Sequence, residues 1–226
     1  MITYEQLLEL LKTRRSVRHF EDRPVIRQDL NRLLDAARWA PSNHNRQPWK
    51  FFIIEERERI REIAEQVRAG METKLRSLPE VAAVHSAGLV QYGTFFADAP
   101  VLIVAMHKLP IAAAAGLWKI TPHPELVSGE PLSVAMAMQN LLLAAHTLGL
   151  GTCVMSAPLL ADDLAKTLQV PPGFAITSLI AVGHPDGIPQ PPRRKTLEQI
   201  AEFDLDPVRS LPPISEVSHS ENPPCT

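Results

Sequence analysis

Apolar and polar residues follow two different periods along the chain, one typical of helices and one typical of strands. Apolar residues spaced three and four apart predict amphipathic helices over residues 3–12, 27–39 and 56–69. Thr3 and Gln6 have the spacing of a capping box at the start of the first helix. Aromatic, β-branched or continuous apolar runs predict strands over residues 49–55, 101–106, 152–155 and 175–182.

The longest predicted helix lies between Ser128 and the glycines at 149 and 151. Ser128 can cap its start, Pro131 suits its first turn, and Gly149 or Gly151 ends it. Its body is apolar nearly all round, so we expect it to be buried on most faces. A short helix is expected over 162–168, and residues 109–130 are interpreted as irregular.

The length of 226 residues suits one domain over residues 1–211. Within this domain, residues 70–130 are interpreted as an excursion from the main fold. Its first part, residues 70–97, is interpreted as a helical segment or lid. From Pro185 onward nine of the chain's 21 prolines occur, which excludes helix interiors and central strands there. Either a disordered tail or an extended arm explains this. Apolar residues up to about Leu211 favour an arm on a partner subunit, with a flexible tail over 212–226.

Composition narrows the class of protein. A formal net charge of −2 argues against a nucleic-acid partner, and the absence of an apolar run of about 18 residues argues against a membrane span. The first residues lack the apolar region of a signal peptide, so we expect a soluble cytoplasmic protein. Two cysteines form no disulfide framework, and Cys153 is interpreted as a buried small hydrophobe. The histidine spacings predict no metal site.

A basic segment over residues 14–18 is the first candidate for chemistry. Arg14, Arg15 and Arg18 place three guanidiniums and the Ser16 hydroxyl within five residues, a set that can bind a phosphate. The alternative is a solvated basic face, or cations that complement the C-terminal end of the preceding helix.

Two further segments carry unusual polar residues. Residues 39–49 (WAPSNHNRQPW) place amide and hydroxyl side chains between two prolines, which suits recognition of a heteroaromatic ring edge or a turn held by its own backbone. Residues 183–195 combine a turn with a second basic cluster, Arg193 and Arg194, which could close on the same phosphate or be a solvated charge run. No phosphate-loop or dinucleotide-binding glycine motif is present.

Together these segments resemble the nitroreductase-like family of FMN-dependent oxidoreductases, from Tyr4 to about Phe203. The motifs that carry the resemblance occur in the family's order: R-R-S-x-R-x-F from Arg14, A-P-S-x-x-N-x-Q-P-W from Ala40, A-P-x-x-I/L-V from Ala99, L-G-L-G-T-C from Leu148, V-G-H-P from Val182 and R-K-x-L-E-x-I from Arg194.

The resemblance implies an α+β fold, with a mixed sheet flanked by helices and a domain-swapped C-terminal arm in a homodimer. It implies FMN at the subunit interface and NAD(P)H as co-substrate. The implied enzyme transfers hydride in ping-pong fashion to a small-molecule acceptor such as a nitroaromatic or a quinone. Two alternatives remain: a reductive dehalogenase that uses a flavin semiquinone, and a non-redox flavin-binding protein.

The resemblance also implies which residues bind the cofactor. Arg14, Ser16 and Arg194, beside Arg193, would hold the FMN phosphate, with Arg15 and Arg18 along the phosphate, ribityl chain and ring edge. The residues expected to reach the flavin of the partner subunit are Pro41, Ser42, Asn43, Asn45 and Gln47. Met155 and Ser156 lie where the family places a donor near flavin N5, and Ser156 is the one candidate catalytic donor. Candidate substrate contacts, each also explained as packing, are Tyr92, Phe95, His107 and Trp118.

Overall fold

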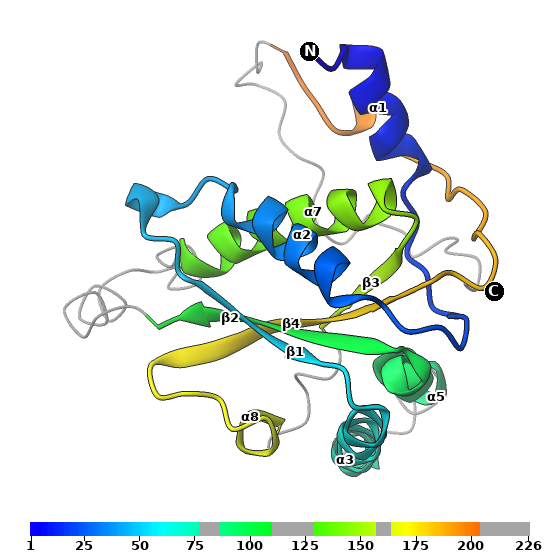
Figure 1. Ribbon diagram of the computed structural model, residues 1–226, viewed down its shortest axis with the longest axis vertical. Helices are drawn as coiled ribbons and strands as arrows, with labels where there is room; N and C mark the ends of the chain where they lie inside the picture. Colours follow the sequence, from blue (N-terminus) through cyan, green and yellow to red (C-terminus); the bar gives the residue numbers. More distant parts are fainter. Residues whose placement is uncertain (77–85, 110–128, 157–163, 204–226) are drawn as a thin grey trace, which may run out of the picture. The chain divides into compact units, whose positions relative to one another are not determined.

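Four strands form one antiparallel sheet in the order β1-β2-β4-β3. The strands are β1 (Trp49–Ile54), β2 (Val101–Lys108), β3 (Gly151–Met155) and β4 (Phe174–Gly183). The computed structural model describes residues 1–76, 86–109, 129–156 and 164–203 (Figure 1). Residues 1–191 form one unit and a second begins at Pro192, so each is described by itself. All four strands fall where the sequence predicts them.

Helices cover both faces of this sheet (Figure 1). One face packs on α2 (Arg27–Arg38) and α7 (Glu130–Thr147), and the other on α3 (Arg57–Arg76), α5 (Ser86–Thr94) and α8 (Leu164–Thr167). Successive side chains of a strand point to opposite faces, so the continuous apolar run of β2 serves both cores. Ile103 lies in the core under α2 and α7, whereas its neighbour Leu102 lies in the core under α3. The expected α+β class is confirmed.

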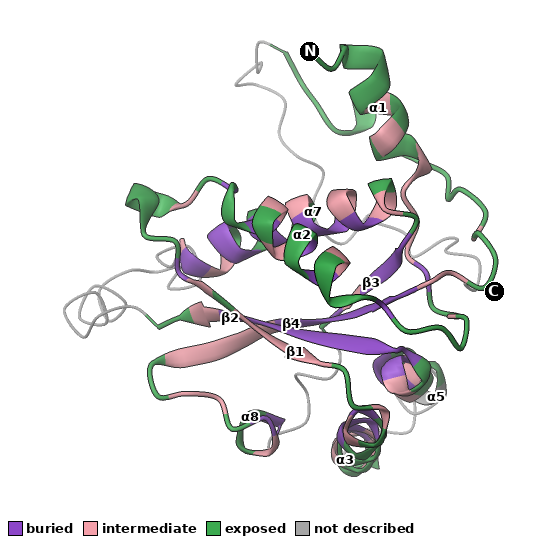
Figure 2. Ribbon diagram, in the orientation of Figure 1, coloured by how far each residue is buried: buried purple, intermediate pink, exposed green. Residues whose placement is uncertain are grey.

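Helix α7 lies on the sheet and is covered on most sides, as expected, but one stripe of it is exposed. Its inner side is fully covered, while Leu132 and Met136 on the stripe remain 68% and 40% exposed (Figure 2). The sheet, α2 and the end of α1 contact the other sides of the helix. Gly129, rather than Ser128, is the N-cap, and Gly149 follows the helix with a left-handed φ of 73°.

Helix α1 (Tyr4–Thr13) begins with the predicted capping box between Thr3 and Gln6 and buries no residue. Its apolar stripe includes Tyr4, Leu7 and Leu11, all of them exposed (Figure 2). An amphipathic helix normally derives its stability from packing of this stripe. Within the unit of residues 1–191, α1 therefore presents an apolar face to solvent.

The segments between the main elements agree with the sequence in part. Helix α3 runs past its predicted end at 69 to Arg76, and the 70–97 segment also contains α5 and the short helix η2 (Phe95–Asp98), so the described parts of this segment are helical as expected. The other short helices are η1 (Asn43–Asn45) and η5 (Leu197–Gln199). Most of the irregular stretch 109–130 and the tail beyond 203 lie outside the described residues. No helix within the described ranges has the length and apolarity to cross a membrane.

Candidate functional site

The basic segment over residues 14–18 leaves α1 and runs beside β3, the edge strand of the sheet. Ser16 forms a parallel bridge with Thr152, and the Val17 amide donates a hydrogen bond of 2.9 Å to the Thr152 carbonyl. Farther along, Phe20 bridges Pro185 at the end of β4. The sheet thus holds this segment by its backbone.

Gly151 makes this close approach possible. A Cβ atom built on Gly151 would lie 2.7 Å from the Cβ of Val17, far inside van der Waals contact. Val17 itself is buried. The glycine of the L-G-L-G-T-C motif therefore has a packing role, since it lets the basic segment lie against the first residue of β3.

Arg15 is held by the end of α1. Its Nη1 donates a hydrogen bond of 2.8 Å to the Arg14 carbonyl and a second, short one to the Lys12 carbonyl. Lys12 belongs to the last helical turn and Arg14 is the C-cap, a position where a cation also complements the helix dipole. The structural alternative considered for the basic segment thus applies to Arg15, and its predicted role along the flavin stays a prediction.

Arg14, Ser16 and Arg18 all act on the Cys153 side chain on β3. Burial raises the pKa of the Cys153 thiol, while the positive charge of Arg18, a hydrogen bond with Ser16 and the charge of Arg14 act in the opposite direction. Cys153 is 4% exposed, as expected for a buried small residue. The three motif residues therefore influence the same residue of the edge strand.

The Arg18 guanidinium also lies over two aromatic rings from the 70–97 segment. Its Cζ atom is 5.3 Å from the centre of the Tyr92 ring on α5 and 6.0 Å from that of Phe95 on η2. Cation–π contacts of this kind fix the direction of an exposed guanidinium. Tyr92 and Phe95, named above as candidate substrate contacts, are thus brought to the basic segment.

His146, near the end of α7, joins this group from the helical layer. Its Nε2 lies 2.9 Å from the Thr13 hydroxyl at the end of α1. Burial lowers the pKa of His146, and the positive charges of Arg14 and then Arg15 lower it further. The sequence did not single out this residue, because a single histidine in an apolar helix is usually a packing residue. The charges that surround it are brought close only by the fold.

The second candidate segment, residues 41–47, forms a tight loop built on η1. The Ser42 hydroxyl accepts a hydrogen bond of 3.0 Å from the Gln47 amide, and the Gln47 side chain donates one of 3.2 Å to Asn45 Oδ1. His44, Asn45 and Gln47 have φ values of 49°, 52° and 47°. Residues other than glycine rarely adopt the left-handed region, so three such residues between positions 44 and 47 indicate a strained backbone with a specific conformation.

This loop is tied to the start of α7. The Asn43 amide donates a hydrogen bond of 3.2 Å to Ser133 Oγ, and Arg46 Nη1 lies 3.2 Å from Glu130 Oε1. Glu130 is 6% exposed, which makes it a rare buried carboxylate. Pro41, Ser42, Asn43, Asn45 and Gln47 thus stand on one clamped loop, and their predicted contact with a partner's flavin stays a prediction.

The remaining predicted residues lie in two places. Met155, which is buried, ends β3, and the exposed Ser156 follows it beyond the sheet. Arg193 and Arg194 are exposed and belong to the second unit, so their convergence with Arg14 stays a prediction.

His107 is a candidate substrate contact whose surroundings the structure describes. His107 Nδ1 lies 2.9 Å from the Thr177 hydroxyl, and burial lowers its pKa against an opposing effect of Glu130. Trp118 lies outside the described residues.

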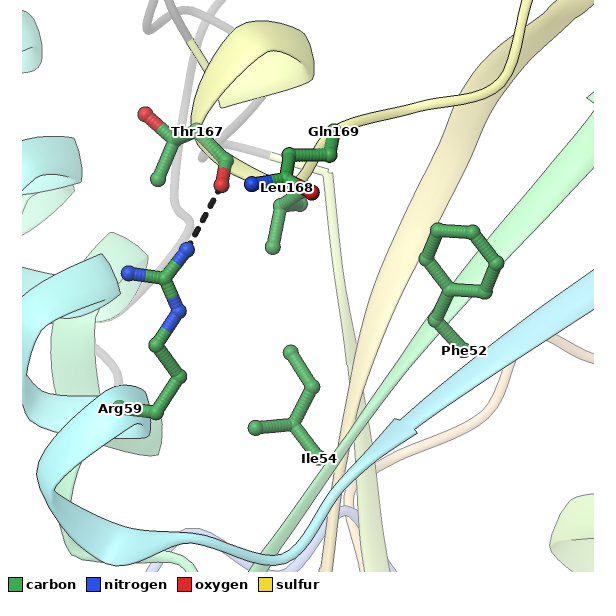
Figure 3. A pocket seen from close by; sticks show the side chains of 6 residues that line it. All are labelled: Phe52, Ile54, Arg59, Thr167, Leu168 and Gln169. Carbon is green, nitrogen blue, oxygen red and sulfur yellow. Dashed lines mark hydrogen bonds between the residues drawn. The ribbon is translucent and has the colours of Figure 1, made fainter.

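A pocket of about 580 Å³ opens at β1, the opposite edge of the sheet from β3 (Figure 3). Its apolar lining comes from Phe52, Ile54 and Leu168. Figure 3 shows the Arg59 guanidinium turned toward the Thr167 carbonyl, to which it donates a hydrogen bond of 2.8 Å. Arg59, the one cationic residue among the described lining residues, thus hydrogen-bonds to the end of α8. The described lining contains no cluster of arginines like the one beside β3. No group of three metal-ligating side chains occurs in the ranges that the structure covers, outside the gaps given above.

Comparison with known proteins relates this chain to a protein family. A family model described as the nitroreductase family matches residues 11–184, a span that contains the basic segment, the 41–47 loop and β3. A protein of Methanothermobacter thermautotrophicus, provisionally named NADH dehydrogenase/NAD(P)H nitroreductase, is 30% identical over 182 residues, or 79% of this chain and 77% of that relative.

Two solved structures show the same fold. A BluB-like flavoprotein from Clostridium difficile 630 has a TM-score of 0.74 at 25% identity, covering 87% of this chain and 98% of that one. Oxidized iodotyrosine deiodinase, bound to FMN and 3-iodo-L-tyrosine, has a TM-score of 0.64 at 25% identity, covering 87% of this chain and all of that one. The structural relatives thus include proteins with different named activities.

Proposed function

This chain belongs to the nitroreductase family, and from that premise we propose that it is an FMN-dependent oxidoreductase. In this proposal NADH or NADPH supplies hydride in one half-reaction. A nitroaromatic, quinone or related electrophile is reduced in the other. The observation that carries the proposal is that Ser16 and Val17 pair with the backbone of β3, while Arg14 and Arg18 beside them act electrostatically on Cys153 of that strand.

The chemistry of this group of residues fits a phosphate monoester. Arg14 and Arg18 both act electrostatically on Cys153 of β3, and Arg14 and Arg15 both act on His146 of α7, so the positive charge of three guanidiniums reaches this edge of the sheet. A phosphate carries close to two negative charges at neutral pH and accepts several charge-assisted hydrogen bonds. Arg14 and Ser16 would hold the phosphate of FMN, and Arg18, directed by its contacts with Tyr92 and Phe95, would lie along the rest of the cofactor.

When bound, FMN supplies the redox chemistry, and the protein supplies binding, orientation and electrostatics. A guanidinium near the flavin ring favours a negatively charged ring, and Arg18 is our candidate for this role. Ser156, exposed beyond β3, is our candidate hydrogen-bond donor near flavin N5. The clamped loop from Pro41 to Gln47 would present amides and hydroxyls to the flavin of a second subunit.

The homodimer is part of this proposal. Helix α1 exposes Leu7 and Leu11, and α7 exposes Leu132 and Met136, so two helices present apolar faces that another subunit could cover. We propose that the domain runs to about residue 211. Its Pro-rich end would be an arm that reaches the partner and brings Arg193 and Arg194 to the phosphate.

The first test is the absorption spectrum of the purified protein, taken anaerobically before and after NADH or NADPH is added. A flavin spectrum that bleaches with either nucleotide is the expected result. Arg14→Ala should release FMN, since each charge-assisted hydrogen bond contributes about 1.5–3 kcal/mol. Arg68→Ala, which removes an equal charge from α3, is the matched control and should retain flavin. A protein that stays colourless with added FMN would contradict the proposal.

A second candidate is reductive dehalogenation, favoured by the similarity to iodotyrosine deiodinase. The two candidates share the cofactor site and differ in the acceptor. Anaerobic incubation of the dithionite-reduced protein with 3-iodo-L-tyrosine separates them, because only the second candidate releases iodide. Steady NAD(P)H oxidation with a nitroaromatic and no iodide release supports the first. Bound flavin that neither nucleotide nor dithionite reduces would instead indicate a non-redox flavin-binding protein.

Truncation tests the arm. A chain that ends at Pro191 keeps every described element of the first unit, including the hydrogen bond from the Asp186 amide to the His19 carbonyl. We expect this chain to lose dimer and flavin together, as measured by light scattering and absorbance. A truncated dimer that retains flavin would show that residues 192–226 serve neither purpose.

A further inference from the structure

We propose that His146 is a positioning residue for the anion site at Arg14 and Arg15, and that it takes up a proton when a phosphate binds there. This inference rests on the proposed function for the identity of the ligand, FMN, and goes beyond it by adding a residue from α7. It also makes binding of the cofactor dependent on pH.

The contact between His146 and Thr13 supports the positioning role in the proposal. Thr13 Oγ1 lies 2.7 Å from the Glu9 carbonyl, to which the hydroxyl donates its proton. The same oxygen then accepts a hydrogen bond from Nε2–H of His146 at 2.9 Å. Helix α1 buries no residue of its own, so this bond anchors the last residue of the helix directly before Arg14.

The hydrogen-bond network also assigns the proton of the neutral ring to Nε2, which leaves Nδ1 to take up a second proton. Protonation at Nδ1 keeps the Nε2–H bond to Thr13 intact. The imidazole can therefore gain a positive charge while it continues to hold the end of α1. The charge of His146 can therefore change without a change in its contact with Thr13.

The charges around His146 set the direction of the coupling. Arg14 and Arg15, from the segment after α1, disfavour the protonated ring, as does burial. Helix α7 carries one other ionisable side chain, Glu130, at its opposite end, and β3 contributes the Cys153 thiol and no charged residue. The other helices packed on α7 carry the charged residues Glu5, Glu9 and Lys12 on α1, and Arg27, Asp29, Arg32, Asp35 and Arg38 on α2. A bound phosphate offsets the two guanidiniums, so protonation becomes easier. By reciprocity, the protonated ring strengthens phosphate binding.

Calorimetry of FMN binding to the flavin-free protein at pH 6.5, in two buffers of different ionisation enthalpy, measures the proton uptake directly. The wild type should take up protons, whereas His146→Gln, which can still donate to Thr13, should take up fewer. Between pH 8 and pH 6.5 the wild type should gain about three- to tenfold in FMN affinity relative to His146→Gln. The comparison is relative because the phosphate itself titrates with a pKa near 6.

Two variants separate position from charge. His146→Ala removes the donor and should weaken FMN binding about two- to tenfold at every pH. Thr13→Val removes the acceptor but keeps the imidazole, so binding should weaken while the pH dependence remains. Riboflavin, which lacks the phosphate, should bind the wild type and His146→Gln with the same pH dependence.

Inorganic phosphate tests the site without a flavin. The His146 ring signal, identified in the proton NMR spectrum by its loss in His146→Gln, should show a pKa that rises by about half to one pH unit with phosphate. That rise without any FMN binding would support the inference and refute the proposed function. Equal proton uptake in the wild type and His146→Gln, with FMN bound, would overturn the inference and leave the proposed function standing. An unchanged His146 pKa in saturating phosphate would also overturn it.

Discussion

Replacing Gly151 by alanine tests how the basic segment is held. The added Cβ would lie 2.7 Å from both Cβ and Cγ2 of Val17 and 2.8 Å from Cγ1. Carbon atoms pack at about 3.5–4.0 Å, so Val17 cannot stay where it is. Valine is stiff at χ1 and has no alternative position for its branched Cβ. Relief therefore requires the backbone of residues 16–18 to move away from β3.

The size of the effect follows from what that movement breaks. Overpacking a core costs about 1–3 kcal/mol, and loss of the hydrogen bond from the Val17 amide to Thr152 adds about 0.5–1.5 kcal/mol. We expect the free energy of unfolding to fall by about 2–4 kcal/mol. Displacement of Arg14 and Ser16 should weaken FMN binding by about 10- to 150-fold, the equivalent of one charge-assisted hydrogen bond.

The assay is a double-mutant cycle with Val17→Ala. Alone, Val17→Ala loses buried methyl groups and should destabilise the protein by about 1–2 kcal/mol. In the Gly151→Ala background it also removes the clashes with Cγ1 and Cγ2, while the contact with the Cβ at 2.7 Å remains, so the double variant should be somewhat more stable than the sum of the single effects predicts. Urea unfolding and fluorescence titration with FMN measure the two quantities.

Gly88→Ala is the matched control. A Cβ at Gly88 on α5 meets no heavy atom within 4 Å, so this change should leave stability unchanged or raise it by up to about 1 kcal/mol. If Gly151→Ala binds FMN as tightly as the control, the close approach of Val17 does not position the basic segment. If Val17→Ala adds its full cost in the Gly151→Ala background, steric pressure from the Cγ atoms of Val17 is not the cause of the loss.

Three further predictions test other contacts. Arg46→Met should lower the free energy of unfolding by about 1–2 kcal/mol, since the buried Glu130 loses a cationic partner, and urea unfolding measures this. Thr3→Ala should speed hydrogen exchange in α1, while global stability changes by under about 1 kcal/mol, because α1 buries no residue. Burial lowers the pKa of His107 and of His146, so below the ordinary histidine value of 6.5 the unfolded chain binds protons that the folded chain does not. Thermal stability should therefore fall as pH drops from about 7 to 5.5, and His107→Gln should reduce that slope.

The sequence predicted the strands and the helices that cover the sheet well, because their hydrophobic residues recur at regular spacings. The continuous apolar run of β2 and the capping box at Thr3 both led to correct elements. The covering of α1 and α7 was harder to infer. A pattern of apolar residues says which side of a helix avoids water, but it does not say whether the chain itself covers that side, as Leu7 and Leu132 show.

The candidate site divides in the same way. The basic segment and the 41–47 loop were found from composition, since three arginines or several amides close together are unusual. The tie between Glu130 and Arg46 was not found, because an acidic residue in the first turn of a helix is ordinary and its burial is a tertiary property. His146 and Thr13 are 133 positions apart in the chain, so no local pattern connects them.

The pairing of the basic segment with β3 and with the residues after β4 also has a consequence for synthesis of the chain. Translation makes residues 14–20 early, but their backbone partners at Thr152 and Pro185 emerge from the ribosome much later. At about 5–20 residues per second, the N-terminal segment waits several seconds or more with its arginines in water. On the proposed function, flavin added to stalled nascent chains should therefore be captured no earlier than the emergence of Pro185 from the exit tunnel, which would make cofactor loading a late step in biogenesis.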